Sequence, residues 1–243
     1  MVHPQAIVMA AGLGTRMSPV TLETPKPLVT VQGTSMIETV IGALLNAGVT
    51  RVHIVVGYLK EQFQFLTEKY PSVTLINNEE YLEKNNISSI YAAAHVLDEG
   101  PTFICEGDLV ISDPQILCQP LESSCYFGRM VQGHTDDWVF DCDSSGRITR
   151  VGKKGNDTYA MVGLSFFNAQ DARHLAEYIR RAYQQDGHEQ LFWDDIVNKH
   201  IQELDLRICP VQANQISEID TVEELVAHDP SYAHVLKETN HAG

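Results

Sequence analysis

The N-terminal segment constrains the fold more than any other part of the chain. A short apolar run, Ala6 to Ala11, leads directly into a loop that contains Gly12 and Gly14. An apolar run of this length followed by glycines is typical of a buried parallel strand that feeds a loop. Glycines let several backbone N–H groups converge on one anion, and Arg16 and Lys26 add positive charge near the two ends of the loop. The segment therefore predicts a strand followed by a phosphate-binding loop.

Two commoner glycine loops do not fit this segment. The Walker-type loop requires G-x-x-x-x-G-K-[ST], and no lysine of the segment follows a glycine at that spacing. The dinucleotide fingerprint G-x-G-x-x-G would need a third glycine at position 17, where the chain has Met17. Glycine spacing alone leaves an ordinary strand-to-loop turn open as an alternative.

Composition excludes several classes of function. The 243 residues suffice for one sizeable α/β domain. The net charge of −15 argues against nucleic acid as a partner, because such binding relies on clustered Lys and Arg. We expect no membrane insertion, since no apolar run approaches the roughly 20 residues of a membrane span, and the N-terminus lacks the basic region of a signal peptide. Five scattered cysteines without a C-x-x-C pair predict reduced thiols and a cytoplasmic protein.

After the loop, apolar strands alternate with amphipathic helices. Ser35 and Glu38 form a capping-box pattern before the first helix. The expected helices are 36–47, 59–69 and 85–97, and the expected strands are 51–57, 73–77 and 101–106. This alternation predicts an α/β fold with a doubly wound, mostly parallel sheet that binds its ligands at the carboxyl ends of the strands.

From residue 123 the pattern changes to an antiparallel one. We expect strands at 125–131, 138–142, 147–151 and 158–167 with a hairpin turn at 143–146, then helices 169–185 and 190–204, strand 206–211 and a terminal helix after Asp220. We expect these antiparallel strands to form an insertion that lies over the ligand-binding crevice of the sheet. We therefore predict a single domain, 1–243, in which about 1–120 plus 206–228 bind a nucleotide and about 121–205 bind an acceptor.

Aromatic residues stand beside acids at two places in the acceptor half. Trp138 follows Asp136 and Asp137, and the segment LFWDD places aromatic residues 192 and 193 before two aspartates. A ring face attracts an ammonium group, and neighbouring acids strengthen the attraction. A cation site is therefore one interpretation, and ordinary packing of half-buried or core aromatic residues is the other.

Longer strings identify a family. AAGLGTRM followed by TPKPL resembles the signature of nucleotidyltransferases that activate sugar phosphates and similar small phosphates. VVGYLKEQF, the segment 85–91, LFWDD and SEIDTVEEL are similar to the small cytidylyltransferases that make CDP-choline-type products, and to their relatives that activate 2-aminoethylphosphonate. Position 192 is Phe where the choline enzymes are expected to have Tyr, which leaves the head group open. The resemblance implies a Rossmann-like nucleotidyltransferase fold.

The resemblance also implies roles for individual residues. It predicts that Asp108 and Asp220 hold Mg²⁺, that Lys26 lies near the α-phosphate and that Arg16 contacts the phosphates. The expected nucleotide-binding residues are Ala10, Ala11, Gly12, Leu13, Gly14, Thr15, Asn86, Ser88, Ser89 and Gly107. The expected acceptor-binding residues are Asp136, Asp137, Trp138, Lys154 (with Lys153 as the alternative), Phe192, Trp193, Asp194, Asp195 and Glu218.

The function expected from these features is a Mg²⁺-dependent transfer of CMP from CTP to a small cationic phosphate or phosphonate, with release of pyrophosphate. Phosphocholine and 2-aminoethylphosphonate are the expected acceptors, and the sequence is compatible with a homodimer. A sugar-1-phosphate nucleotidyltransferase and a catalytically silent nucleotide-binding regulator are the two alternatives.

Overall fold

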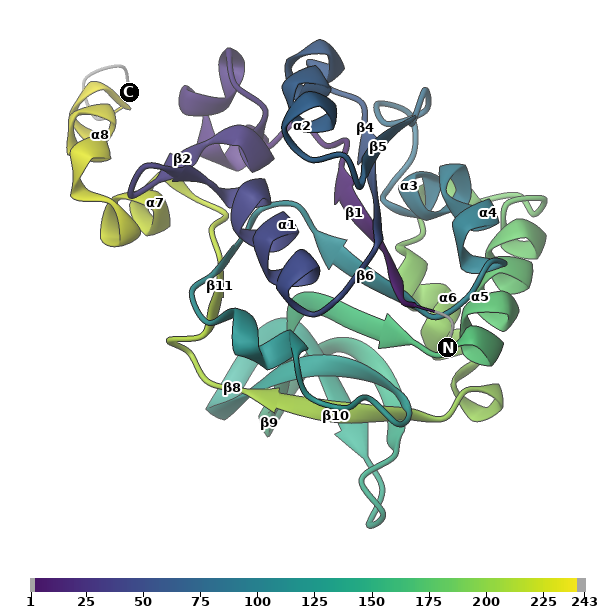
Figure 1. Ribbon diagram of the computed structural model, residues 1–243. Coiled ribbons are helices and arrows are strands. Elements are labelled where there is room, and N and C mark those ends of the chain that lie inside the picture. Colours follow the sequence, from purple (N-terminus) through teal and green to yellow (C-terminus); the bar gives the residue numbers. More distant parts are fainter. Residues whose placement is uncertain (1–2, 240–243) are drawn as a thin grey trace.

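A mixed, mostly parallel sheet of seven strands runs through the molecule (Figure 1). The structure is a computed structural model that describes residues 3–239. The strand order is β10-β8-β9-β6-β1-β4-β5, and β9 is antiparallel to both of its neighbours, whereas the other pairs are parallel. The strands are β1 (Gln5–Ala10), β4 (Arg51–Val56), β5 (Val73–Asn77), β6 (Thr102–Glu106), β8 (Ser124–Cys142), β9 (Ile148–Phe167) and β10 (Leu206–Val211).

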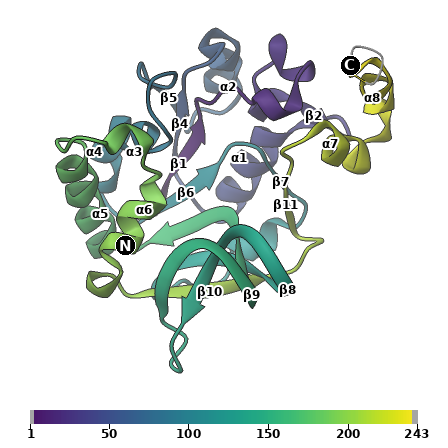
Figure 2. The same cartoon turned by 180° about the vertical axis from the view of Figure 1, so that it is seen from behind.

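Helices cover both faces of this sheet (Figures 1 and 2). Helices α1 and α2 pack on one face, and α3 to α6 pack on the other. Among the described residues, none of the helices is both long and apolar enough to cross a bilayer. The helices are α1 (Met36–Asn46), α2 (Gln64–Lys69), α3 (Ile87–Ala92), α4 (Ala94–Leu97), α5 (Ala169–Ala182), α6 (Trp193–Lys199), α7 (Val222–His228) and α8 (Ala233–Thr239).

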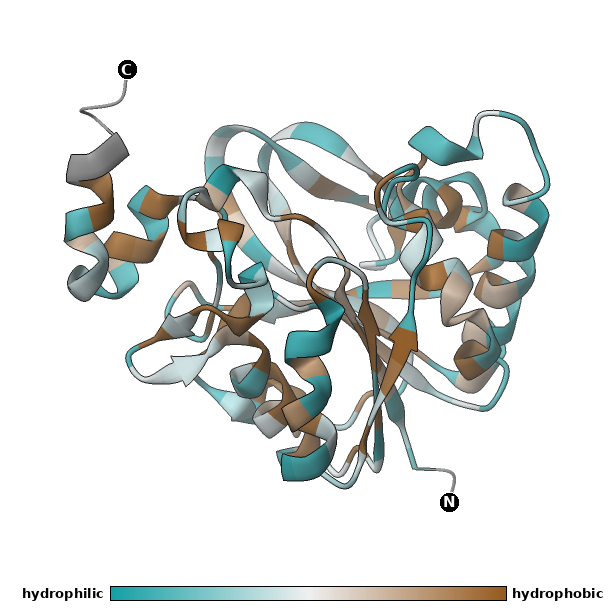
Figure 3. Cartoon of the chain, turned by 90° about the horizontal axis from the view of Figure 1, so that it is seen from above, coloured by the Kyte–Doolittle hydropathy of each residue, from teal (hydrophilic) through white to brown (hydrophobic). Residues whose placement is uncertain are grey.

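The apolar run of β1 is continuous because both of its faces are buried. Ala6 and Val8 pack into the core beneath α1, and Ile7 and Met9 pack into the core beneath α3 to α6. Successive side chains of a strand point to opposite faces, so a strand between two helical layers needs apolar residues at every position. Figure 3 shows the result: the central strands are largely hydrophobic, whereas the helices carry hydrophobic and hydrophilic residues in alternation.

Helix α1 illustrates how a helix packs against the sheet through one apolar face. Ile37, Val40, Ile41 and Leu44 recur at helical spacing and are fully buried. Burying such side chains contributes about 1.5–3 kcal/mol each. The helix ends before Gly48, which adopts a left-handed φ of 81°.

The expected capping box at the start of α1 does not form. The Ser35 hydroxyl donates a hydrogen bond of 2.7 Å to the Glu38 carboxylate and accepts none from the backbone of the helix. Glu38 also accepts hydrogen bonds from Lys69 and Tyr70, and this second set of partners holds its carboxylate away from the helix N-terminus.

A small two-stranded sheet joins the C-terminal part of the chain to the end of β6. Strand β7 (Leu109–Ile111) pairs antiparallel with β11 (Ile216–Glu218), so that Glu218 lies opposite Leu109. The Ile219 N–H donates to the Asp108 carbonyl at 3.3 Å. Residues 109 and 111 positions apart in the chain therefore meet at the carboxyl edge of the main sheet. A second such sheet pairs β2 (Thr30–Val31) with β3 (Thr34–Ser35).

The acceptor half differs from the prediction in its strands. The four expected strands are two long ones, β8 and β9, which form a hairpin with several register shifts. Their polar middle parts, near His134 and Asn156, are paired through the backbone although their side chains are largely exposed. The expected hairpin turn at 143–146 is present, with the Gly146 N–H bonded to the Asp143 carbonyl.

Four expected helices are shorter than predicted by three residues or more. The helix 169–185 ends at Ala182 as α5. The helix 85–97 is interrupted at Ala93 between α3 and α4, and 3-10 turns replace the beginning of 59–69 and the end of 190–204. Thr221 caps α7: its hydroxyl accepts from the Glu224 N–H, and the Glu224 carboxylate accepts from the Thr221 N–H. The terminal residues 1–2 and 240–243 of the predicted domain lie outside the described residues.

Candidate functional site

A cleft of about 980 Å³ opens at the carboxyl ends of β1 and β6. It is lined by the glycine loop, the start of α3, the β8–β9 hairpin and the segment that contains β11. Its volume lies at the upper end of the range of small-molecule and cofactor sites. This is the edge of the sheet where an α/β fold places its ligands.

The two glycines of the loop serve different purposes. Gly14 has a left-handed φ of 63°, and a Cβ added there would lie 2.8 Å from the Cβ of Lys26. Any larger residue at position 14 would therefore strain the backbone and push Lys26 away. A Cβ added to Gly12 would meet nothing within 4 Å, so Gly12 leaves open space beside the cleft. The Thr21 hydroxyl fixes the loop by donating to the Gly14 carbonyl at 2.9 Å.

Lys26 lies at the centre of the charged end of the cleft. Its ammonium group forms ion pairs with Asp108 and, at 2.7 Å, with Asp220. Arg16, whose side chain is 67% exposed, pairs with the same Asp220 carboxylate at 2.7 Å. Burial alone would lower the pKa of Lys26, but the two carboxylates more than offset this effect and the pKa stands above its ordinary value. Lys26 is therefore a fixed positive charge.

Three carboxylates converge beside this lysine. One oxygen each from Asp108, Glu218 and Asp220 lie within 4.8 Å of one another. Asp108 Oδ1 is buried and has no hydrogen-bond partner among the described residues. Burial and the charges of Asp108 and Asp220 raise the pKa of Glu218 to about 8. Carboxylate oxygens are the ligands that Mg²⁺ and Ca²⁺ prefer, so the chemistry of this donor set fits a hard divalent cation.

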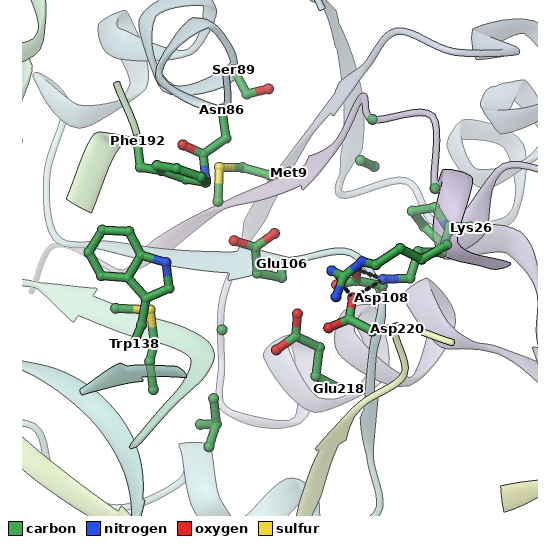
Figure 4. Close-up of a pocket in the computed structure, with 18 of the residues that line it drawn as sticks. Met9, Lys26, Asn86, Ser89, Glu106, Asp108, Trp138, Phe192, Glu218 and Asp220 are labelled. Atoms are coloured by element: carbon green, nitrogen blue, oxygen red, sulfur yellow. Dashed lines mark hydrogen bonds and ion pairs between the residues drawn. The ribbon is translucent and has the colours of Figure 1, made fainter. Parts of the chain in front are cut away.

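Glu106 is a site residue that the sequence did not identify. Its side chain points into the cleft between the aromatic end and the three carboxylates (Figure 4). Burial, together with the charges of Asp108 and Glu218, raises its pKa well above the ordinary value. Its position at the carboxyl end of β6, two residues before Asp108, is the one signal that could have revealed it, because ligands of such a sheet bind at the carboxyl ends of its strands.

The expected base-contacting residues lie together at one wall of the cleft. Ser88 and Ser89 are buried and accept hydrogen bonds from the Asn78 amide at 2.9 and 3.2 Å. The Asn86 side-chain oxygen accepts from the Trp193 N–H at 3.1 Å, which ties the start of α3 to the start of α6. All four polar residues line the cleft.

Trp138 and Phe192 form the other wall. Their rings lie edge to face with centroids 5.5 Å apart, and both residues line the cleft with Asp136 and Asp137. The Lys153 ammonium lies 5.6 Å from the Trp138 ring centroid and 5.0 Å from that of Phe192. Both distances are short enough for a cation–π interaction. The Lys153 ammonium therefore already lies against the two rings.

Three residues expected to bind the acceptor do not line the cleft. Trp193 is buried in the core, where it stacks on Tyr126. Asp195 accepts a hydrogen bond of 2.8 Å from the Phe192 N–H and so caps α6. Lys154 is exposed and pairs with Asp136 at 3.4 Å, whereas its neighbour Lys153 lines the cleft.

Two residues expected to bind the nucleotide also lie outside the lining. Leu13 is exposed on the loop. A Cβ added to Gly107 would lie 2.8 Å from the Met9 carbonyl oxygen, so glycine is needed there for β6 to end close against β1. The remaining expected residues of the loop, Ala10, Ala11, Gly12, Gly14 and Thr15, line the cleft.

Asp194 is a buried cleft residue that hydrogen-bonds to a fully buried tyrosine. Its carboxylate accepts a hydrogen bond of 2.8 Å from the Tyr126 hydroxyl. Burial raises its pKa to about 7, although the Tyr126 hydrogen bond acts in the opposite direction. The folded protein therefore holds a proton on Asp194 at a pH where the unfolded chain has lost it.

This shift predicts a pH-dependent effect of Asp194→Asn on stability. Because the pKa of Asp194 is higher in the folded state, its proton stabilises that state fully at a pH below the unfolded pKa, which is near 4. This stabilisation is lost as the pH rises to the folded pKa of about 7. The free energy of unfolding of the variant, relative to the parent, should therefore increase between pH 4 and pH 7.5, by no more than about 4 kcal/mol. Chemical denaturation across this range measures the difference. Tyr126→Phe removes the hydroxyl donor and should move the window to higher pH, whereas a variant difference that does not change with pH would contradict the assignment.

Comparison with known proteins agrees with this architecture. The model of the MobA-like NTP transferase domain matches residues 6–192. The 2-aminoethylphosphonate cytidylyltransferase of Lancefieldella rimae is 64% identical over 232 residues, which cover 96% of this chain and 94% of that protein. The choline-phosphate cytidylyltransferase of Streptococcus pneumoniae is 33% identical over 90% of this chain and 94% of its own length.

Solved structures show the same fold. A structure of the CTP:phosphocholine cytidylyltransferase from Streptococcus pneumoniae superposes with a TM-score of 0.87 at 31% identity, covering 95% of this chain and 99% of that one. The inositol-1-phosphate CTP transferase from T. maritima, at 17% identity, has a TM-score of 0.76 over 96% of this chain and 95% of its own, and shares the fold alone. The matched family domain, the whole-length relatives and the cleft at the end of β1 lead to one conclusion: this chain belongs to the MobA-like NTP transferase family.

Proposed function

We propose that this protein is a Mg²⁺-dependent cytidylyltransferase that transfers CMP from CTP to 2-aminoethylphosphonate and releases pyrophosphate. The observation that carries the proposal is the identity of 64% to a 2-aminoethylphosphonate cytidylyltransferase over nearly the whole of both chains. The cleft supports it, because it combines an anion-binding glycine loop, a buried lysine and a cluster of carboxylates. The cytoplasmic location and the homodimer expected from the sequence remain part of this proposal.

The glycine loop and α3 would bind CTP. The backbone of residues 10–15 would surround the triphosphate, with Arg16 on its phosphates, and Asn86, Ser88 and Ser89 would contact the base. Arg16 suits the leaving pyrophosphate because its side chain is exposed at the mouth of the cleft and a guanidinium can contact two phosphate oxygens at once.

The reaction is a single in-line displacement. An oxygen of the phosphonate attacks the α-phosphorus of CTP, a new P–O bond forms, and the bond from the α-phosphorus to the bridging oxygen breaks as pyrophosphate leaves with its electron pair. The phosphonate oxygen is ionised near neutral pH, so the protein needs no general base to create the nucleophile. What it must supply is positioning and positive charge, because the two reactants are anions. Lys26 is placed to stabilise the charge that grows on the α-phosphoryl group.

Asp108 and Asp220, with Glu218 beside them, would hold the metal ion. Their oxygens already converge, and one Asp108 oxygen has no hydrogen-bond partner within the described part of the chain. When bound, Mg²⁺ would neutralise negative charge on the phosphate and phosphonate oxygens. Lys26 pairs with the same two aspartates and therefore holds both carboxylates in place beside the glycine loop.

The aromatic wall would receive the acceptor. Trp138 and Phe192, with Asp136, Asp137 and Asp194 in the same lining, present apolar surface and negative charge together. Sugar hydroxyls call for neutral polar side chains, whereas this wall suits an amine-bearing acceptor. The choline-phosphate relative makes phosphocholine the second candidate acceptor.

The test is a grid of substrates. Pyrophosphate release is measured with Mg²⁺ and each of CTP, UTP, dTTP, GTP and ATP against 2-aminoethylphosphonate, phosphocholine, phosphoethanolamine and glucose 1-phosphate. We expect kcat/KM for CTP with 2-aminoethylphosphonate to exceed that of every other pair by at least about tenfold. A higher value with phosphocholine or glucose 1-phosphate would contradict the proposed acceptor, and a lack of pyrophosphate release from every pair would contradict the enzyme.

A further inference from the structure

Glu106 is one of two acids of the cleft whose carboxylates have no hydrogen-bond or ion-pair partner among the described residues. Eight acids line the cleft, and six of them form a hydrogen bond or an ion pair with other described residues. The other two are Glu218, which belongs to the cluster of three carboxylates, and Glu106. No hydrogen bond or ion pair joins the Glu106 carboxylate to any residue between 3 and 239. A half-buried carboxylate without a donor is costly unless a ligand supplies one.

The direction of this side chain is fixed by the strands around it. Glu106 is the last residue of β6 and pairs with Met9 of β1. On the other side, Gly163 of β9 has a left-handed φ of 70°, and a Cβ added there would lie 2.8 Å from Glu106 Cγ. The glycine therefore makes room for the Glu106 side chain, which extends into the cleft (Figure 4).

The aromatic pair does not by itself account for an acceptor's ammonium group. The Lys153 ammonium already lies over the rings of Trp138 and Phe192. Asp136 is paired with Lys154, and Asp194 with the Tyr126 hydroxyl. Between this aromatic wall and the three convergent carboxylates lies Glu106, whose own carboxylate has no partner among residues 3–239 (Figure 4).

The spacing between Glu106 and Asp108 matches a short acceptor. Two residues apart, their Cα atoms are separated by no more than about 7 Å. In 2-aminoethylphosphonate two carbons join the ammonium to the phosphonate, so a phosphonate near Lys26 and Asp108 would leave the ammonium within reach of Glu106. A primary ammonium has three N–H donors, whereas a trimethylammonium has none, so a bare carboxylate distinguishes the two.

We propose that the Glu106 carboxylate accepts hydrogen bonds from the primary ammonium of the acceptor and so selects 2-aminoethylphosphonate over acceptors without N–H donors. This inference rests on the proposed function. It makes Glu106 a specificity-determining residue that binds substrate and takes no part in the bond-making step. Gly163 is the residue that positions it.

The test compares two acceptors in parent and variant. Ethylphosphonate has the same reacting group as 2-aminoethylphosphonate but no ammonium. We expect Glu106→Gln to lower kcat/KM for 2-aminoethylphosphonate by about 10²-fold and to change kcat/KM for ethylphosphonate by less than about threefold. The preference of the enzyme for 2-aminoethylphosphonate over ethylphosphonate should therefore be largely lost. The affinity for CTP, measured by calorimetry, should stay within about threefold of the parent, which also shows that the variant is folded.

Further variants keep the proposal falsifiable. Gly163→Ala should reduce the same preference without removing a charge, and Glu106→Asp should retain part of it. Asp171→Asn is the matched control, because Asp171 is a buried acid that bonds to Ser124 outside the cleft, and it should leave the ratio of the two acceptors unchanged. Equal losses with both acceptors in Glu106→Gln would overturn the proposal, as would a parent enzyme that shows no preference between them while still transferring CMP. A parent that uses neither acceptor with CTP would overturn the proposed function, and this inference with it.

Discussion

Substitution of Asp108 by Asn is expected to lower kcat by about 10³-fold while the protein stays folded. Asp108 supplies one of the three convergent carboxylates, and its Oδ1 atom has no other partner among the described residues. An amide of the same shape keeps the packing but removes the charge that would hold the metal ion. Because the metal would neutralise two anions that must meet, its loss should affect turnover far more than the KM of CTP.

The measurement is pyrophosphate release at saturating CTP and acceptor over a series of Mg²⁺ concentrations. Asp113→Asn is the matched control, since Asp113 follows closely in the chain but does not line the cleft: its side chain caps a 3-10 turn by accepting from the Gln115 N–H and also accepts from the Gln215 amide at 2.9 Å. The control should keep kcat within about threefold of the parent. If Asp108→Asn retains Mg²⁺-dependent turnover near the parent value, the assignment of the metal to this cluster is wrong.

The parallel part of the fold could be predicted from the sequence because it depends on burial. The run Ala6 to Ala11 is apolar at every position, since both faces of β1 are covered by helices. The expected strands 73–77 and 206–211 have the observed bounds, and 101–106 is correct to within one residue. The polar middle of β8 and β9 could not be predicted in this way, because there the backbone pairs while the side chains are exposed and carry no alternation.

In the candidate site, too, some residues could be predicted from local sequence and others could not. The glycine loop and Lys26 could be recognised because their spacing is local, and Asp108 because it follows a buried strand. Asp220 was assigned through the family resemblance, since nothing local indicates that β11 would pair with β7 and bring it beside Lys26.

The sequence does not show which of the neighbouring aromatic side chains, Phe192 or Trp193, faces the cleft and which is buried in the core. Asp195 caps α6 at Phe192, and this cap turns Trp193 into the core and leaves Phe192 in the cleft. The sequence does not indicate Glu106, because the direction of a side chain at the end of a strand depends on its tertiary neighbours, here Gly163. It also leaves open which of Lys153 and Lys154 faces the cleft.

Lys26→Met should lower kcat by about 10³-fold and at the same time reduce the Mg²⁺ concentration needed for half-maximal activity. The first effect follows because Lys26 would stabilise the charge on the α-phosphoryl group. The second follows because Lys26, with a side chain only 9% exposed, pairs with Asp108 and Asp220. A divalent cation bound to these carboxylates is repelled by the lysine, so the removal of the lysine should strengthen metal binding while weakening catalysis.

The opposite signs of these two effects separate a role in catalysis from a role in the scaffold. A merely structural lysine would, on removal, disorder the carboxylates and raise the Mg²⁺ requirement together with the loss of turnover. Lys26→Arg should not restore activity, because the side chain is packed against Gly14 and a guanidinium is larger than an ammonium. Lys69→Met is the matched control: Lys69 pairs with Glu38 at 2.6 Å and does not line the cleft, so both parameters should stay at the parent values. A kcat for Lys26→Met within about tenfold of the parent would contradict the proposed role, since one charged contact to a developing phosphoryl charge is expected to contribute more than that.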